Sequence, residues 1–218
     1  MNKKHYIKIA NNHLTDSIIL INNPNSLDYS KERSQFILDT SKRWLELLNR
    51  KDSLAEDVEN LLGTIYFREI SETGKTFFIP RLFADIYLWA KECNLLTGKS
   101  REMMIELFTA EANTMDEYYD NWMTDPPEKH VPLAISIVKK WINMINSDQV
   151  IQEDVDRIID KIISYNVMAG SMFSGLAGEF RLWAVVEGFK VLSEKKLDKH
   201  FKKVSEDWIR EFIKKKDK

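Results

Sequence analysis

Two pairs of aspartates have the type and spacing of residues that could bind a metal ion. Asp116 and Asp120 lie in the stretch DEYYDNW, and Asp156 and Asp160 lie in the stretch DRIID. A spacing of four residues places both carboxylates of a pair on one side of a helix. Proteins hold Mg²⁺ through one or two carboxylates together with the phosphates of a substrate. The two pairs therefore indicate a candidate chemistry, the Mg²⁺-dependent reaction of a diphosphate.

The direction of these aspartates on their helices indicates whether they can face a shared cavity, as metal ligands would, or face solvent. In both helices the aspartates stand roughly 80–140° from the centre of the apolar face, so they point to the flank or to water. The pairs resemble those of isoprenoid synthases of the squalene and phytoene type, in which both pairs face one central cavity. The resemblance implies a Mg²⁺-dependent enzyme with the four aspartates as metal ligands, and we keep it as the first alternative to a surface role.

Two other charged residues fall on helix faces that should be buried. Glu111 lies about 60° from Phe108 on the apolar side of its helix. Arg181 lies on the side of an expected helix 176–194 that carries small and apolar residues, with Glu179 on the charged stripe opposite. Because buried charges are normally paired, we predict that Glu111 and Arg181 meet in the core or line a small polar pocket. The alternative is that each charge reaches the wet rim of its helix.

Three aromatic residues complete this candidate binding site. Tyr118 lies near Glu111 on the apolar side of the helix, while Tyr119 and Trp122 belong to the apolar face itself. We therefore predict a binding site that consists of Glu111, Arg181, Tyr118, Tyr119 and Trp122. No residue is assigned a catalytic role.

Catalytic signatures are missing from the chain. It contains no His-Glu-x-x-His, Cys-x-x-Cys, Gly-x-Ser-x-Gly or Gly-x-Gly-x-x-Gly motif, each of which would mark a metal, redox, acyl-transfer or nucleotide site. This favours a non-enzymatic binding or regulatory module without a cofactor over an enzyme. A protein partner or self-association is expected, and a small-molecule ligand is compatible with the polar pocket.

A second alternative comes from the stretch RSQFILDTSKRWLELL and the later GTIY at 63–66. Together they resemble the opening helix and recognition segment of the TetR family of repressors, which implies a ligand-responsive regulator. The sequence departs from the family pattern because Leu62 runs directly into Gly63. A helix-turn-helix needs a turn between its two helices.

Composition and charge limit the class of protein. The chain has 218 residues, a net charge of −2 and one cysteine, so neither a general affinity for nucleic acid nor an internal disulfide is expected. Its longest uncharged run is short of a membrane span, and we predict a cytoplasmic protein that does not enter the membrane. Eight acids and no bases occur between Glu102 and Glu128, which is typical either of solvated helix faces or of a surface for a cationic partner.

Apolar periodicity predicts an all-α, bundle-like protein with seven to eight helices. Ser30, Ser53 and Ser100 are the expected N-caps of three of them. Further helices are expected at 80–96, 133–146, 148–165, 176–194 and 197–214, and the six tryptophans are expected to anchor the core. The first thirty residues are expected to be irregular or to form short strands. Three prolines in 125–132 predict a hinge between an N-terminal lobe, 1–124, and a C-terminal lobe, 133–218, with one domain favoured over two independent ones.

Overall fold

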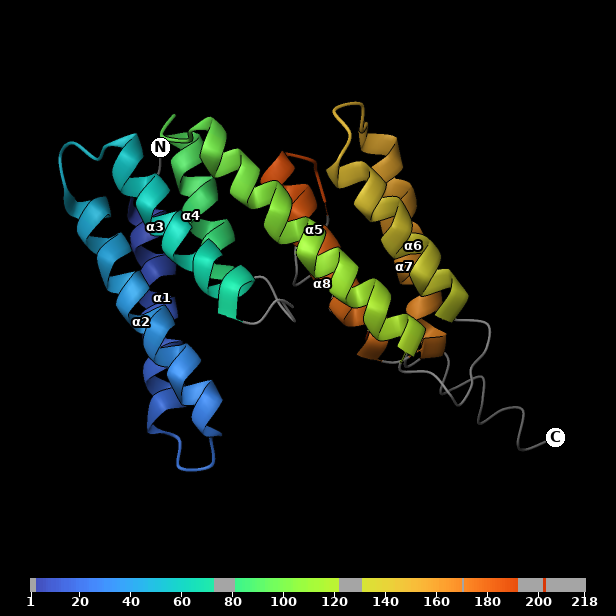
Figure 1. Ribbon diagram of the computed structural model, residues 1–218, viewed down its shortest axis with the longest axis horizontal. Helices are drawn as coiled ribbons and strands as arrows, with labels where there is room; N and C mark the ends of the chain where they lie inside the picture. Colours follow the sequence, from blue (N-terminus) through green and yellow to red (C-terminus); the bar gives the residue numbers. More distant parts are fainter. Residues whose placement is uncertain (1–2, 73–80, 122–130, 170, 192–201, 203–218) are drawn as a thin grey trace. The chain divides into compact units, whose positions relative to one another are not determined.

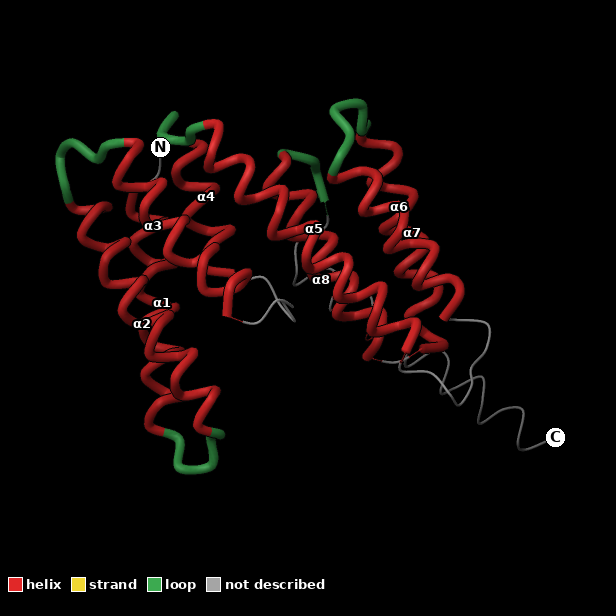
Figure 2. Tube along the Cα trace, in the orientation of Figure 1, coloured by secondary structure: helices red, strands yellow, loops and turns green. Residues whose placement is uncertain are grey.

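The computed structural model describes residues 3–72, 81–121, 131–169, 171–191 and 202 of the chain. Across these residues there are eight α-helices and one short π-helical turn. Figure 2 shows the helices in red, with no strand in the part of the chain that is described. The prediction of an all-α, bundle-like protein with seven to eight helices is therefore confirmed. The chain divides into two compact units, Met1–Leu107 and Phe108–Lys218.

Unit 1, Met1–Leu107, is built around a helical hairpin (Figure 1). The two hairpin helices pack against each other along their length, and two further helices pack against the hairpin. The elements of this unit are α1 (Lys3–Asn22), α2 (Asp28–Asn49), α3 (Ala55–Phe67), the π-helical turn η1 (Arg68–Glu72), α4 (Arg81–Glu92) and the first part of α5 (Gly98–Asn121).

Helix α1 corrects the prediction of an irregular or short-strand N-terminal segment. Its buried side chains are Tyr6, Ala10 and Ser17, which lie at helical spacing on one face. The ring of Tyr6 lies 6.4 Å from that of Trp44 on α2. Because one of the three buried residues is polar and another is only a methyl group, the apolar pattern alone does not reveal this face. Contact with α2 stabilises the helix instead.

Two polar contacts join α1 to α4. The Tyr6 hydroxyl donates a hydrogen bond to Glu92 Oε1 at 2.7 Å, and His13 Nε2 lies 2.8 Å from Asp85 Oδ2. Burial, and then the hydrogen bond to Glu92, raise the pKa of Tyr6 far above its usual value. These contacts hold α1 against α4 at two points along the helix.

The helix starts in unit 1 differ from the predicted N-caps. Helix α2 begins after Leu27 rather than at Ser30, and α3 begins after Leu54 rather than at Ser53. The Ser53 hydroxyl instead donates to the backbone carbonyl of Leu47 at the end of α2, at 2.8 Å. Ser53 therefore closes the turn between α2 and α3 and does not cap α3.

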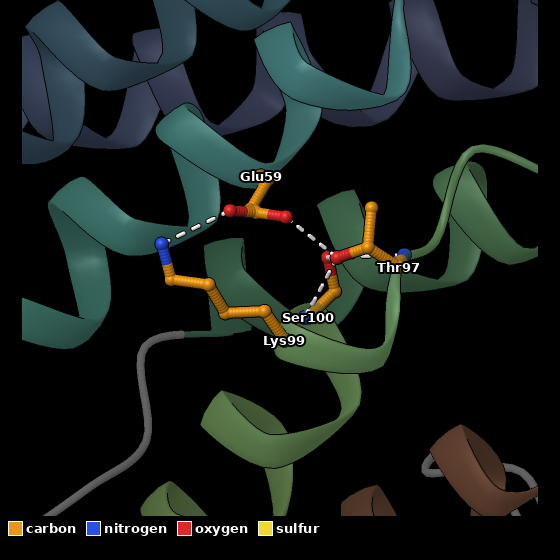
Figure 3. Close-up of polar contacts among 4 residues, drawn as sticks. All are labelled: Glu59, Thr97, Lys99 and Ser100. Carbon is orange, nitrogen blue, oxygen red and sulfur yellow. Dashed lines mark hydrogen bonds and ion pairs between the residues drawn. The ribbon is translucent and has the colours of Figure 1, made fainter.

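The start of α5 is fixed by a polar cluster that Figure 3 shows. Thr97 is its cap, because the backbone N–H of Ser100 donates to Thr97 Oγ1 at 3.1 Å; the predicted cap was Ser100 itself. Thr97 Oγ1 also donates to Glu59 Oε2 at 2.7 Å, and Lys99 Nζ lies 3.0 Å from Glu59 Oε1. Glu59 thereby joins α3 to the first turn of α5.

Unit 2, Phe108–Lys218, contains the rest of α5 and three more described helices. These are α6 (Val131–Ile145), α7 (Gln152–Ala169) and α8 (Ser171–Glu187), of which α8 packs against both α7 and α6. A line of aromatic rings forms the centre. Phe108 on α5 lies 6.4 Å from Trp141 on α6, Trp141 lies 5.9 Å from Phe180 on α8, and Phe180 lies 5.4 Å from Trp183.

Two helices end earlier than the periodicity predicts. Helix α4 stops at Glu92 because Asn94 has a φ of 56°, and α8 stops at Glu187 because Gly188 has a φ of 102°. In each case the residue after the left-handed one donates a backbone hydrogen bond to the last turn of the helix. The N–H of Leu95 donates to the carbonyl of Ala90, and the N–H of Phe189 donates to the carbonyl of Ala184. This is the hydrogen-bond pattern of a helix that ends in a left-handed residue.

The remaining predictions about the fold are met only in part. Four tryptophans, Trp44, Trp89, Trp141 and Trp183, are at most 2% exposed and do anchor the core. Trp122 and Trp208 lie outside the described residues, and so does the expected helix 197–214 apart from Lys202. So do residues 125–130 of the predicted hinge, whereas Val131 and Pro132 begin α6. None of the helices that the structure describes combines the length and the apolar character of a membrane span.

Candidate functional site

Glu111 lies in the core of unit 2. Its side chain is 0% exposed, and it occupies α5 about one turn after Phe108, whose ring contacts Trp141. The burial predicted from the helical wheel is correct for this residue. A carboxyl group in such a place loses its hydration and needs compensating interactions from the protein.

Helix α8 is rotated relative to the prediction. Arg181 is half-buried, and Glu179, which was expected on the charged stripe, is 9% exposed and therefore buried. The large rings of Phe180 and Trp183 set the inward face, and Glu179 lies one turn before Trp183 on that face. The small residues that defined the predicted face have less apolar surface to bury, so the aromatic rings decide the orientation of the helix.

The other members of the predicted binding site cannot be placed around Glu111. Tyr118 and Tyr119 belong to α5, but their side chains are outside what the structure describes, and Trp122 lies outside the described residues altogether. The pairing of Glu111 with Arg181 stays a prediction. A cavity of about 10 Å³ lies in unit 2 between α7 and α8; its lining residues are Ile159, Ile162, Ile163 and Ala177. It is apolar and holds at most one water molecule, so it is not the predicted polar pocket.

The four aspartates lie in different surroundings. Asp156 and Asp160 on α7 are exposed, as the helical wheel predicts, and Gln152 Nε2 donates to Asp156 Oδ1 at 2.9 Å. Asp116 on α5 is half-buried, and its Oδ1 is buried without a hydrogen-bond partner among the described residues. The side chain of Asp120 is not described. Over the described part of the chain, no three His, Cys, Asp or Glu side chains converge as metal ligands.

Two further sequence features can be located. The stretch GTIY lies inside α3, which is continuous from Ala55 to Phe67, so no turn separates Leu62 from Gly63. The acidic stretch on α5 is not one solvated surface, because Glu102, Glu106 and Glu117 are exposed while Glu111 is buried. Asp125 and Glu128 lie outside the described residues.

An exposed apolar surface at the free end of the α1–α2 hairpin was not predicted. Among the described residues eight large apolar side chains are exposed, and five of them gather within twelve positions of the chain. We call these five the hairpin tip: Ile18 (47% exposed), Ile19 (61%), Leu20 (45%), Leu27 (62%) and Tyr29 (69%). Figure 1 shows that this end of the hairpin extends beyond the ends of α3 and α4.

Near its tip, the hairpin buries polar side chains and exposes apolar ones, which is the reverse of the usual arrangement in a soluble protein. Ser17 on α1 and Ser34 on α2 are each 3% exposed, while Ile18 and Ile19 next to Ser17 face solvent. A buried polar residue beside an exposed apolar surface is informative, because single exposed apolar side chains are common but clusters are not. The signal in the sequence is the run SIILI, whose four apolar residues cover every side of a helix end.

Comparisons of the chain with models of protein families, with curated proteins and with solved structures find no match. The candidate site therefore rests on the geometry of the chain alone.

Proposed function

We propose that the chain is a non-enzymatic binding module that contacts a protein partner through the hairpin tip. The observation that carries the proposal is the concentration of exposed apolar side chains there. Four aliphatic side chains and one tyrosine, each exposed by about half or more, present apolar surface on the order of a few hundred Å² around the end of the hairpin. Apolar patches of this size on soluble proteins are often interaction sites.

The charges around the hairpin tip favour a protein as the partner. Three acids and two bases flank it: Asp16, Asp28, Glu32, Lys31 and Arg33. A surface with this near balance does not attract the phosphates of a nucleic acid or the head groups of an anionic membrane. An apolar centre with a mixed polar rim is the usual anatomy of a protein–protein interface. With its rim, the hairpin tip is large enough to form the centre of an interface of standard size, about 800 Å² on each partner.

Neither alternative function is supported by a comparable observation. The enzyme needs both aspartate pairs to face one cavity, and Asp156 and Asp160 are exposed. The TetR-like regulator needs a turn at Leu62–Gly63, where α3 is continuous.

The proposal is tested by Ile19→Ser with Ile151→Ser as its matched control. Ile19 is 61% and Ile151 is 55% exposed, so neither change should alter folding stability by more than about 0.5 kcal/mol. Burying one isoleucine at an interface contributes about 1.5–3 kcal/mol. Ile19→Ser should therefore weaken the partner complex, or a self-complex, roughly tenfold or more, whereas Ile151→Ser should leave it unchanged.

Size-exclusion chromatography with light scattering over a range of concentrations detects a self-complex, and chemical cross-linking in cells with mass spectrometry detects other partners. Circular dichroism on each variant confirms that the helices are intact. A chain that forms no complex with itself or another protein would contradict the proposal, as would a complex that Ile19→Ser leaves intact.

A further inference from the structure

An open depression of about 740 Å³ lies in unit 1 at the end of α2 away from the hairpin tip. Figure 2 shows the loop after α2 and the loop before α2 at opposite ends of that helix. The depression is formed where the loop after α2, residues 50–54, meets the start of α1 and the end of α4. Its volume lies within the range of small-molecule sites, roughly 300–1,000 Å³.

The inner wall of the depression is apolar and held in place by the core. It includes Leu47, Leu48 and Trp89, which are 7%, 3% and 2% exposed. The ring of Trp89 lies 6.2 Å from that of Trp44. The bond from Ser53 Oγ to the Leu47 carbonyl holds the loop to the end of α2. The wall is therefore present before any ligand arrives, which reduces the free-energy cost of binding.

The rim of the depression is positively charged. Lys3, Arg50 and Lys51 line it, against the single acid Asp52. Arg50 Nη1 lies 3.4 Å from Asp57 Oδ2, which compensates part of its charge, but Lys3 and Lys51 form no ion pair within the described part of the chain. A smaller depression of about 140 Å³ nearby has two bases and two acids in its lining, Arg43, Arg50, Glu46 and Asp57. Its charges balance, so it has no preference for an anion over a cation.

An exposed apolar residue lies on the same rim. Leu54 lines the depression and is 62% exposed, although it occupies the N-cap position of α3, where serine, threonine, aspartate and asparagine are preferred. Leu54 therefore does not serve the helix through its side chain. Its position is suited to covering the apolar part of a bound molecule.

We infer that this depression binds a small amphipathic anion, in which a carboxylate or phosphate group is joined to an apolar chain or ring. The apolar part lies against Leu54 and Leu95, which line the depression with accessible surface, and the anionic group lies near Lys3 and Lys51. This site is separate from the hairpin tip, so the inference does not depend on the proposed function.

Cys93 provides a direct reporter, because it lines the depression and is the single cysteine of the chain. It is half-buried, and burial, followed by the charge of Glu92, raises the pKa of its thiol. Alkylation of the full chain by iodoacetamide would be followed by mass spectrometry at about pH 8.5, where an ordinary thiol is half ionised. The probes are decanoate and decyl phosphate below their micellar concentrations, with decyltrimethylammonium as the cationic control.

Either anion should slow the alkylation of Cys93 at least about threefold, with saturation at one molecule per chain by calorimetry, and decyltrimethylammonium should not. Protection by decanoate alone identifies a carboxylate ligand, and protection by decyl phosphate alone identifies a phosphate ligand. Lys51→Glu should weaken binding roughly two- to fivefold, the usual scale for an exposed charge, while Lys140→Glu on α6 makes the same change in net charge and should have no effect.

Leu54→Ser provides a second variant that should fold, because serine is a favoured N-cap; it should also weaken binding. The inference is overturned if neither anion protects Cys93, if the cationic amphiphile protects it equally, or if Lys51→Glu and Leu54→Ser bind as tightly as the unmodified chain.

Discussion

Among single residues, carboxyl groups show how differently one chemical group is used in this fold. Glu111 is fully buried in unit 2, Glu179 is nearly so, and Glu59 joins two helices at a partly exposed position in unit 1. Buried carboxyl groups need compensating interactions, and a large part of typical folding stability is lost when one is left without them. Glu111 and Glu179 are therefore sensitive positions for stability, whatever the protein binds.

The predicted pairing of Glu111 with Arg181 can be tested by a double-mutant cycle. If the two side chains are coupled, Arg181→Ala should destabilise the fold toward the lower end of about 3–5 kcal/mol, because Arg181 is only half-buried. Adding Glu111→Ala should then recover part of that loss. Urea unfolding of the four proteins measures the coupling. Strictly additive effects would show that Glu111 has a different partner.

Glu59 should make stability depend on pH. The hydrogen bond from Thr97, and then the contact with Lys99, hold the pKa of Glu59 below its usual value. Because the pKa is lower in the folded state, the stabilisation is present above the unfolded pKa of about 4.3 and is lost as pH falls through the folded pKa. Glu59→Gln should therefore lower stability at neutral pH, with the deficit vanishing in acid.

Urea unfolding at about pH 7 and about pH 3 would measure this change. Glu46→Gln on α2 is the matched control, since Glu46 is exposed and forms no ion pair in the described part of the chain. An equal deficit for Glu59→Gln at both pH values would contradict this account of Glu59.

Among the helices, the sequence predicts those with a regular apolar stripe and misses those whose buried face is mixed. Helix α6 was predicted at 133–146 and occupies Val131–Ile145. Helix α1 was missed because Ser17 belongs to its buried face. Helix ends were misplaced where a single left-handed residue, Asn94 or Gly188, stops the helix, since apolar periodicity contains no information about φ.

Of the candidate functional features, the sequence predicts the burial of Glu111 but not the hairpin tip. The burial of Glu111 follows from its place on the helical wheel. The hairpin tip does not, because the run SIILI fits a short strand as well as a helix end until α1 is known to be a helix. Exposure of its side chains depends on how far the hairpin extends beyond α3 and α4, which is a property of tertiary packing.

Helix α8 offers a pair of glycine substitutions with opposite expected effects. Gly178 is exposed within the helix, and a Cβ added there meets no atom of the described residues within 4 Å. Gly178→Ala should therefore stabilise the fold by about 0.8–1 kcal/mol. Gly188→Ala should destabilise it by about 1–2 kcal/mol, because its φ of 102° is strained for alanine. Thermal and urea unfolding would measure both; a destabilising Gly178→Ala would indicate that another group packs against that position.

For the whole molecule, the central claim is that the hairpin tip is a protein-binding surface. Unit 1 presents two surfaces at opposite ends of its hairpin, the apolar hairpin tip and the cationic depression. Their chemistry differs, so they should bind different classes of molecule. The hairpin tip differs more from an ordinary protein surface than the depression does, because five large apolar side chains are exposed there.

The most direct measurement places a photo-reactive amino acid, p-benzoylphenylalanine, at position 19 in one form of the chain and at position 151 in another. Both positions hold exposed isoleucines, in unit 1 and unit 2 respectively, so the label should be tolerated equally. Illumination in cells should produce a discrete cross-linked protein species from position 19, at a defined mass, and little or none from position 151. No discrete species from position 19, or the same species from both positions, would contradict the account.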